Sequence, residues 1–313
     1  MNKKIIYLLT AAIGIFVASC SEESETTETY NPFNEPKIAE FTASSVEIEK
    51  KTDNITINES WSNITRDSKN RITDYDYKYN LEGTFSQVET NTTKIDYYTD
   101  HLGNEAIRSV ANLTYAKVDE KGIEEKYSRK VQENITLNSK GLIESISSII
   151  DHYDKDGNSQ MYTSQRSFTY KGNFCTKSIY KDHDGKITYN YNWNNYQLYN
   201  ITVLKENNDG SIEYNTYDYT FDTKNLYGYY GTEPLPFIQN TLPCIFASMG
   251  YFGRCTPYLL LEEVQGGYSK FDNTTSNNMK VKNSYNFHGD KEYRFTYSVS
   301  SNIFKTYNII YNK

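Results

Sequence analysis

The sequence contains few of the residues from which catalytic and metal centres are usually built. Its 313 residues include four Cys and four His, with no C-x-x-C pair and no His at ligand spacing, so no motif marks a metal centre. The G-x-S-x-G motif of many serine hydrolases is also absent. We therefore expect a protein that is not an enzyme and that holds no metal or other cofactor.

Basic clusters and long apolar runs are scarce as well. The net charge is −7 and no stripe of Lys and Arg stands out, which argues against nucleic acid as a partner. Beyond the N-terminus no apolar run is long enough for a transmembrane helix. Hydrophobic residues make up 37% of the chain and the mean hydropathy is −0.75. These values are low for a thick two-layer core, but they suit a sheet with one dry and one wet face.

Turn signals recur at regular intervals along most of the chain. Each is a quartet that begins with Asp or Asn, whose side chain can accept a hydrogen bond from the backbone two residues on. All but the first end in Gly, which takes a positive φ without steric cost. The quartets are Asp67–Asn70, Asp100–Gly103, Asp119–Gly122, Asn138–Gly141, Asp154–Gly157, Asp182–Gly185 and Asn207–Gly210.

Between the turns, residues alternate with a period of two. In Ile187–Trp193 the apolar and aromatic side chains share one face, and Thr and Asn share the other, as in a half-buried strand. With 31 Tyr and 14 Phe, aromatic rings make up for a modest aliphatic content. We predict an all-β fold, a curled antiparallel β-meander that is open or closed into a barrel-like body.

One segment interrupts this pattern. Between Leu226 and Val264 lie four Pro residues and the apolar run Cys244–Met249. Pro243 at a first helical position and Gly250 just after the run predict one short helix, Leu242 to Met249. Since an apolar helix must bury its face, we expect it to act as a plug or cap of the barrel.

The N-terminus carries the most specific signal. A pair of Lys residues precedes the apolar stretch Ile5–Val17, which is typical of a secretion signal. The segment Val17 to Cys20 resembles the lipobox of bacterial lipoproteins, in which the Cys is acylated and becomes the mature N-terminus. We therefore expect residues 1–19 to be a lipoprotein signal peptide and Cys20 to be anchored in a membrane by its alkyl chains.

The residues that follow predict a tether and an orientation. Residues 20–38 are polar and acidic, as in a disordered linker, and residues 39–313 form the single predicted β-domain. Glu22 and Glu23 match the surface-export signal of Bacteroidota lipoproteins. Because a solvated linker is often acidic in any case, two orientations on the outer membrane stay open, the cell surface and the periplasmic face.

These features together resemble a known family. The lipobox, the Tyr-rich strands with Asp-x-x-Gly turns and the segment Gly250–Leu260 resemble a family of Bacteroidota lipoproteins of unknown function with a porin-like fold. The resemblance implies an antiparallel, barrel-like meander and no activity, and it carries over no functional residues. The strand rhythm is also similar to the YD repeats of large bacterial toxin shells. A membrane-spanning barrel is disfavoured, because the lipobox offers another anchor and the hydropathy is low.

The cysteines and histidines have simple structural interpretations. Apart from Cys20, three Cys remain: Cys244 and Cys255 are candidates for a disulfide in an oxidising compartment, or all three, Cys175 included, are buried thiols. The four His residues lie at or near turns and are expected on the surface. Two quartets, Asp154–Gly157 and Asp182–Gly185, resemble fragments of calcium loops, but they lack the remaining carboxylates and turn chemistry explains them.

Binding is the function class that the sequence leaves most open. Tyr189, Tyr191 and Trp193 would form a flat aromatic row for stacking a ligand if their face were wet; otherwise the row is the dry face of the sheet. We expect a binding or interaction module for a glycan or for a host or envelope protein. The alternatives are a structural envelope component and, third, a hydrolase whose active site the sequence does not reveal.

The export signal can be tested on whole cells. We expect protease to digest the protein on intact cells, as it would any surface domain, while a periplasmic control protein survives. Protection until lysis would contradict the interpretation of Glu22 and Glu23 and would move the search for partners to the periplasm.

Overall fold

The computed structural model describes residues 45–51, 54–194, 197–221, 250–253, 260–269, 275–288, 292–299 and 303–312. Side-chain environments are described for residues 54–194, 197–221 and 250–253 and for a few positions beyond them. The predicted helix Leu242 to Met249 lies outside these residues, and the described part contains no helix. It contains no helix long and apolar enough to cross a membrane.

The described residues form sixteen strands. They are β1 (Ser45–Lys51), β2 (Thr56–Arg66), β3 (Ile72–Glu82), β4 (Ser86–Thr99), β5 (Glu105–Val118), β6 (Glu124–Leu137), β7 (Ile143–Asp154), β8 (Ser159–Lys171), β9 (Phe174–Lys181), β10 (Gly185–Asn194), β11 (Gln197–Asn207), β12 (Ile212–Phe221), β13 (Leu260–Ser269), β14 (Thr275–His288), β15 (Glu292–Val299) and β16 (Ile303–Asn312).

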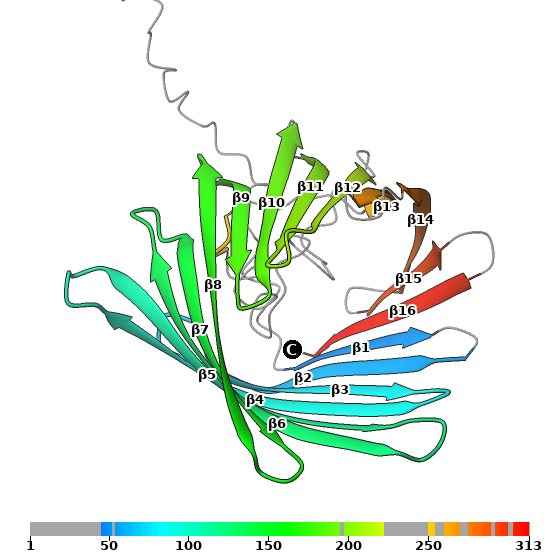
Figure 1. The fold of residues 1–313 in the computed structure, drawn as a ribbon, viewed down its shortest axis with the longest axis horizontal. Helices are drawn as coiled ribbons and strands as arrows, with labels where there is room; N and C mark the ends of the chain where they lie inside the picture. Colours follow the sequence, from blue (N-terminus) through cyan, green and yellow to red (C-terminus); the bar gives the residue numbers. More distant parts are fainter. Residues whose placement is uncertain are drawn as a thin grey trace, which may run out of the picture.

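Each strand pairs antiparallel with the next one in the chain (Figure 1). The eleven strands β2–β12 form an uninterrupted open meander by themselves. Backbone pairing of β12 with β13, and of β16 with β1, completes a closed ring. The all-β antiparallel meander predicted from the sequence is confirmed.

The turns have the predicted chemistry. At the β7–β8 turn, Asp154 Oδ1 accepts hydrogen bonds from the backbone N–H groups of Asp156 and Asn158, each at 2.9 Å, while Gly157 has a φ of 81°. The same pattern of two backbone donors recurs at Asp67, Asp100, Asp119 and Asn138. The side chain that begins each of these turns therefore accepts hydrogen bonds from the backbone of the same turn.

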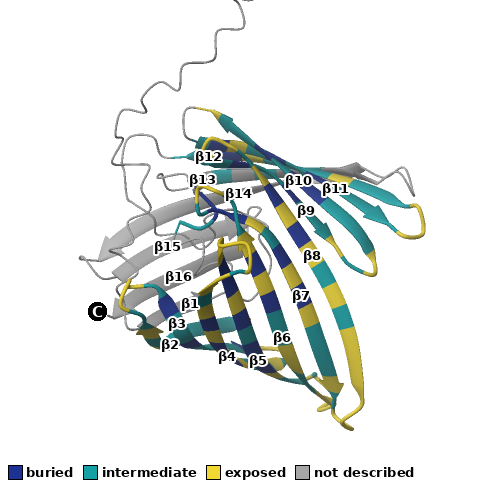
Figure 2. Cartoon of the chain, turned by 90° about the vertical axis from the view of Figure 1, so that its left-hand side faces the viewer, coloured by how far each residue is buried: buried dark blue, intermediate teal, exposed yellow. Residues whose placement is uncertain are grey.

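The sheet has one packed and one polar face. On β5, Ile107, Ser109 and Ala111 are buried, whereas Arg108 and Asn112 on the opposite face are exposed; Figure 2 shows this alternation along the neighbouring strands. The buried set shares the face on which the segment 250–253 packs within the ring (Figure 1). We call this the inner face and the opposite one the outer face.

The outer face of the described strands is polar over most of its length. On β4 and β8 most of its exposed side chains are hydroxyls, amides and charges, and the exceptions are Val88, Tyr98 and Met161. The polar side chains include Thr90, Thr92, Lys94 and Asp96 on β4 and Thr163, Gln165, Ser167, Thr169 and Lys171 on β8. Water solvates such a face directly.

Glycine is required at the start of β10. Gly185 has a φ of 150°, and a Cβ built there would overlap the backbone oxygen of Glu206 on β11. Gly157 also has positive φ but has open space around it. We expect Gly157→Ala to cost about 1 kcal/mol of unfolding free energy and Gly185→Ala at least about twice that. Denaturant unfolding of the two variants measures the difference. Equal losses of unfolding free energy would mean that the backbone of β11 moves away from the added Cβ without strain.

Candidate functional site

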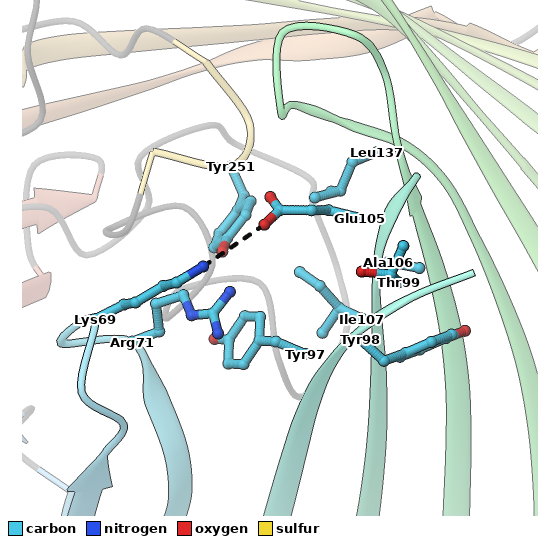
Figure 3. Close-up of a pocket in the computed structure, with 10 residues that line it drawn as sticks. All are labelled: Lys69, Arg71, Tyr97, Tyr98, Thr99, Glu105, Ala106, Ile107, Leu137 and Tyr251. Carbon is cyan, nitrogen blue, oxygen red and sulfur yellow. Dashed lines mark ion pairs between the residues drawn. The ribbon is translucent and has the colours of Figure 1, made fainter. Parts of the chain in front are cut away.

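One end of the inner face is tied together by a charged cluster (Figure 3). The Arg71 side chain binds Asp67 through Nε and a terminal nitrogen, each at 2.7 Å, and its guanidinium lies 3.9 Å from the Tyr97 ring centroid. The Tyr97 hydroxyl donates to the Ile72 carbonyl at 3.0 Å. Tyr251 stacks on Tyr97 with centroids 6.4 Å apart.

This cluster surrounds a cavity of about 120 Å³. Burial raises the pKa of Asp67, but hydrogen bonds from Arg71 and Lys69 outweigh it and hold the pKa below its usual value. Lys69 and Glu105 at the mouth lie 3.9 Å apart and are exposed. Since its charges are already paired, we interpret this pocket as the place where the segment 250–253 docks.

A buried carboxylate lies farther along the inner face. Glu133 is 1% exposed and accepts hydrogen bonds from the hydroxyls of Ser109, at 3.2 Å, and Ser148, at 3.3 Å. Burial raises its pKa above the usual value, although the two serines and Arg166 act in the opposite direction. The group is shielded from solvent, so it is suited to a structural role.

Toward the other rim, the inner face carries a row in which tyrosines and carboxylates are cross-strand partners. Each residue lies directly opposite the next on the neighbouring strand, from β2 to β7. We call it the tyrosine–carboxylate row; it consists of Glu59, Tyr79, Glu89, Tyr115, Tyr127 and Asp154.

Aromatic contacts extend along this row. Tyr115 stacks on Tyr127, with centroids 4.3 Å apart, and Tyr127 contacts the ring of His152 at 4.8 Å. The Arg129 guanidinium lies 4.6 Å from the Tyr127 centroid and donates to His152 Nδ1 at 3.1 Å. Unlike the buried core around Ile107, these side chains are only half-buried or exposed. The wall therefore offers ring faces, carboxylates and a cation to a ligand.

The aromatic row predicted from the sequence lies elsewhere on the inner face. Tyr189 and Tyr191 expose 5% and 2% of their surface, and the Trp193 Nε1 donates to the Cys175 carbonyl at 2.7 Å. The dry-face alternative describes this environment. Ligand stacking by these three residues stays a prediction, and the geometry favours the tyrosine–carboxylate row over it.

The structure describes some of the other residues that the sequence singled out. Cys175 is buried and its thiol contacts the Lys177 carbonyl at 3.6 Å. The histidines His101 and His183 lie at turns as expected, and His183 pairs with the adjacent Asp184 at 3.3 Å. With Asp182 they form an exposed group of metal-ligand type, which the turn explains.

Five further predicted residues lie outside the described part of the chain. They are Cys20, Glu22, Glu23, Cys244 and Cys255. Lipidation, export and the candidate disulfide therefore stay predictions.

The tyrosine–carboxylate row was missed from the sequence because it exists only across strands. Its six members are spread from residue 59 to residue 154, and only the hairpin registers place them side by side. The signal available beforehand was the shared parity of Tyr75, Tyr77 and Tyr79 on one strand. His152 was predicted just before a turn and on the surface; it does lie two residues before the Asp154 turn, at the end of β7, but it is half-buried in the aromatic contacts.

Comparison with known proteins identifies similar folds. No protein-family model matches the chain, and no curated protein does. A porin-like protein from Bacteroides vulgatus has a TM-score of 0.50 and 12% identity, over 86% of this chain and 98% of that one. A porin-like protein from Bacteroides uniformis has a TM-score of 0.49 and 16% identity, over 86% and 96% of the two chains. At this low identity, the similarity to the Bacteroides vulgatus protein shows that the two chains share a porin-like fold and nothing about function.

The raised pKa of Glu133 predicts how stability depends on pH. Because the folded state holds the proton more tightly than the unfolded state, stability falls as pH rises from the unfolded pKa through the folded one. We expect Glu133→Gln to melt like the parent near pH 4 and at a higher temperature at pH 7. Thermal unfolding at both pH values measures this; a variant less stable at pH 7 would show that the charged form is favoured in the fold.

Proposed function

We propose that this protein is a lipoprotein of the outer membrane, anchored through Cys20 and exposed at the cell surface, that acts as a non-enzymatic binding module. The observation that carries the proposal is the tyrosine–carboxylate row, a half-exposed aromatic and acidic wall on the inner face of an otherwise well-packed sheet. Aromatic faces with a few placed polar groups are what binding sites generally offer. The ligand is a glycan or a protein of the host or envelope.

The polar outer face supports an anchor outside the protein body. A barrel that spans a bilayer presents an apolar band to lipid and keeps its polar residues inside. Here the outer face of β4 and β8 carries hydroxyls, amides and charges, while Ile107 and Ile135 lie on the inner face. Such a body is held at a membrane most simply by alkyl chains on a tether, as the lipobox predicts.

A structural envelope component is the second candidate, and one observation favours it. Phe252 is 1% exposed and packs on Phe168, with ring centroids 5.1 Å apart. This packing is expected if side chains fill the interior of the barrel. This packing lies toward the rim with the charged cluster. It leaves the tyrosine–carboxylate row, nearer the other rim, as the part available for binding.

The anchor is tested by removing its thiol. We expect Cys20→Ser to abolish incorporation of a labelled fatty acid and to release the protein into the soluble fraction after signal cleavage, or to leave it as uncleaved precursor. Cys175→Ser, which changes a buried thiol, is the matched control and should leave lipid labelling intact. Undiminished labelling of the Cys20→Ser variant would refute the proposed anchor.

A further inference from the structure

We propose that the inner wall around Glu89 and Asn91 is a saccharide site, which takes a neutral hexopyranose oligomer by stacking on tyrosine rings and by hydrogen bonds to its hydroxyls. The inference rests on the proposed binding function and assigns its ligand class. It is carried by two polar groups on one face of β4, the Glu89 carboxylate and the Asn91 amide nitrogen, for which the described residues supply no hydrogen-bond partner.

Glu89 is an acceptor without a donor. It is half-buried between Tyr79 on β3 and Tyr115 on β5. Among the described residues it has no hydrogen bond and no ion pair, and burial raises its pKa while the nearby Arg129 partly offsets the effect. A half-buried carboxylate can still accept hydrogen bonds from a ligand at its exposed side, so a ligand that supplies O–H donors fits here.

The Asn91 amide has a donor that the described residues leave without an acceptor. Its side chain is 2% exposed, and its Nδ2 has no hydrogen-bond partner in the described part of the chain, whereas its Oδ1 accepts from the Thr93 hydroxyl at 3.2 Å. It lies two residues from Glu89, hence on the same face of the strand. Buried unsatisfied amides are rare in folded proteins, which marks this one as a group that a ligand would complete once a covering side chain moves aside.

The two groups together select the ligand class. A cation such as a polyamine would satisfy Glu89 but leave the Asn91 amide without an acceptor. An anion would do the reverse and would meet the repulsion of Glu59, Glu89 and Asp154 along the row. A hydroxyl both donates and accepts, so neighbouring hydroxyls of one sugar serve both residues.

The surrounding rings have the matching shape. Tyr77 lies opposite Asn91, and Tyr79 and Tyr115 lie opposite Glu89 on either side. The stack then continues through Tyr127 to His152. Neighbouring strands are about 4.8 Å apart, close to the length of one pyranose unit, so Tyr79 on β3 and Tyr115 on β5 can contact alternate sugars of one chain on either side of Glu89.

The test is calorimetric titration of the full-length protein in detergent with two neutral probes, maltohexaose and cellohexaose, and with spermine as a cationic probe. We expect saturable binding of at least one hexasaccharide and none of spermine. Glu89→Gln and Tyr115→Ala should each weaken that binding about tenfold or more, the scale of one charged hydrogen bond or one stacked ring. Thr90→Ala, which changes the outer face of the same strand, should leave it unchanged.

A double variant separates binding from folding. In Asn91→Leu/Thr93→Val both members of a hydrogen-bonded pair become apolar, which is close to neutral for stability when shapes match. We expect its melting temperature to equal or exceed that of the parent while hexasaccharide affinity falls. If this variant bound the hexasaccharide as tightly as the parent does, Asn91 would not be part of the site.

The remaining outcomes are equally decisive. Failure of both hexasaccharides to bind to folded protein, or binding of spermine instead, overturns the saccharide assignment; spermine binding lost on Glu89→Gln would still leave a binding module at this wall. Hexasaccharide affinity that survives both Glu89→Gln and Tyr115→Ala places the ligand elsewhere. Loss of the Cys20 anchor, by contrast, would refute only the membrane attachment.

Discussion

Cross-strand register is the constraint on which the rest of this structure depends. In an antiparallel meander each hairpin fixes the pairing of two strands, and a slip of one residue would exchange the two faces. The Asp and Asn turns hold that register with side-chain hydrogen bonds to the backbone, as Asp154 does between β7 and β8. With the faces fixed, strands of low hydropathy form one packed and one solvated surface.

The packed surface changes character along the strands. Toward one rim it is closed by paired charges, aromatic stacking and the segment 250–253, with Arg71 held by Asp67 and Tyr97. Toward the other it keeps half-buried tyrosines and a half-buried carboxylate, Glu89, to which no described residue donates a hydrogen bond. A stable fold tolerates a few unsatisfied polar groups, and natural proteins tend to keep them where they function. We interpret this asymmetry as a division between a part that stabilises the barrel and a part that binds.

The sequence predicts local features well and long-range ones poorly. Turn residues and period-two alternation depend on near neighbours in the chain, so turns such as Asp154–Gly157 were predicted at the positions where the structure has them. Whether a face is wet depends on what covers it, so Tyr189 and Tyr191 were left with two interpretations and the burial of the sheet favours the dry one. The tyrosine–carboxylate row depends on five registers at once, and the amide of Asn91 becomes conspicuous only when it is known that its nitrogen has no hydrogen-bond partner among the described residues.

The central claim is that the outer face of this barrel lies in water, with the body held at a membrane by its tether. A nitroxide attached at Thr92→Cys, on the outer face of β4, in protein kept in outer-membrane vesicles reports which solvent surrounds it. We predict strong relaxation by a water-soluble nickel chelate and weak relaxation by oxygen, which concentrates in lipid. Strong relaxation by oxygen with protection from the chelate would place this face in the bilayer and contradict the account.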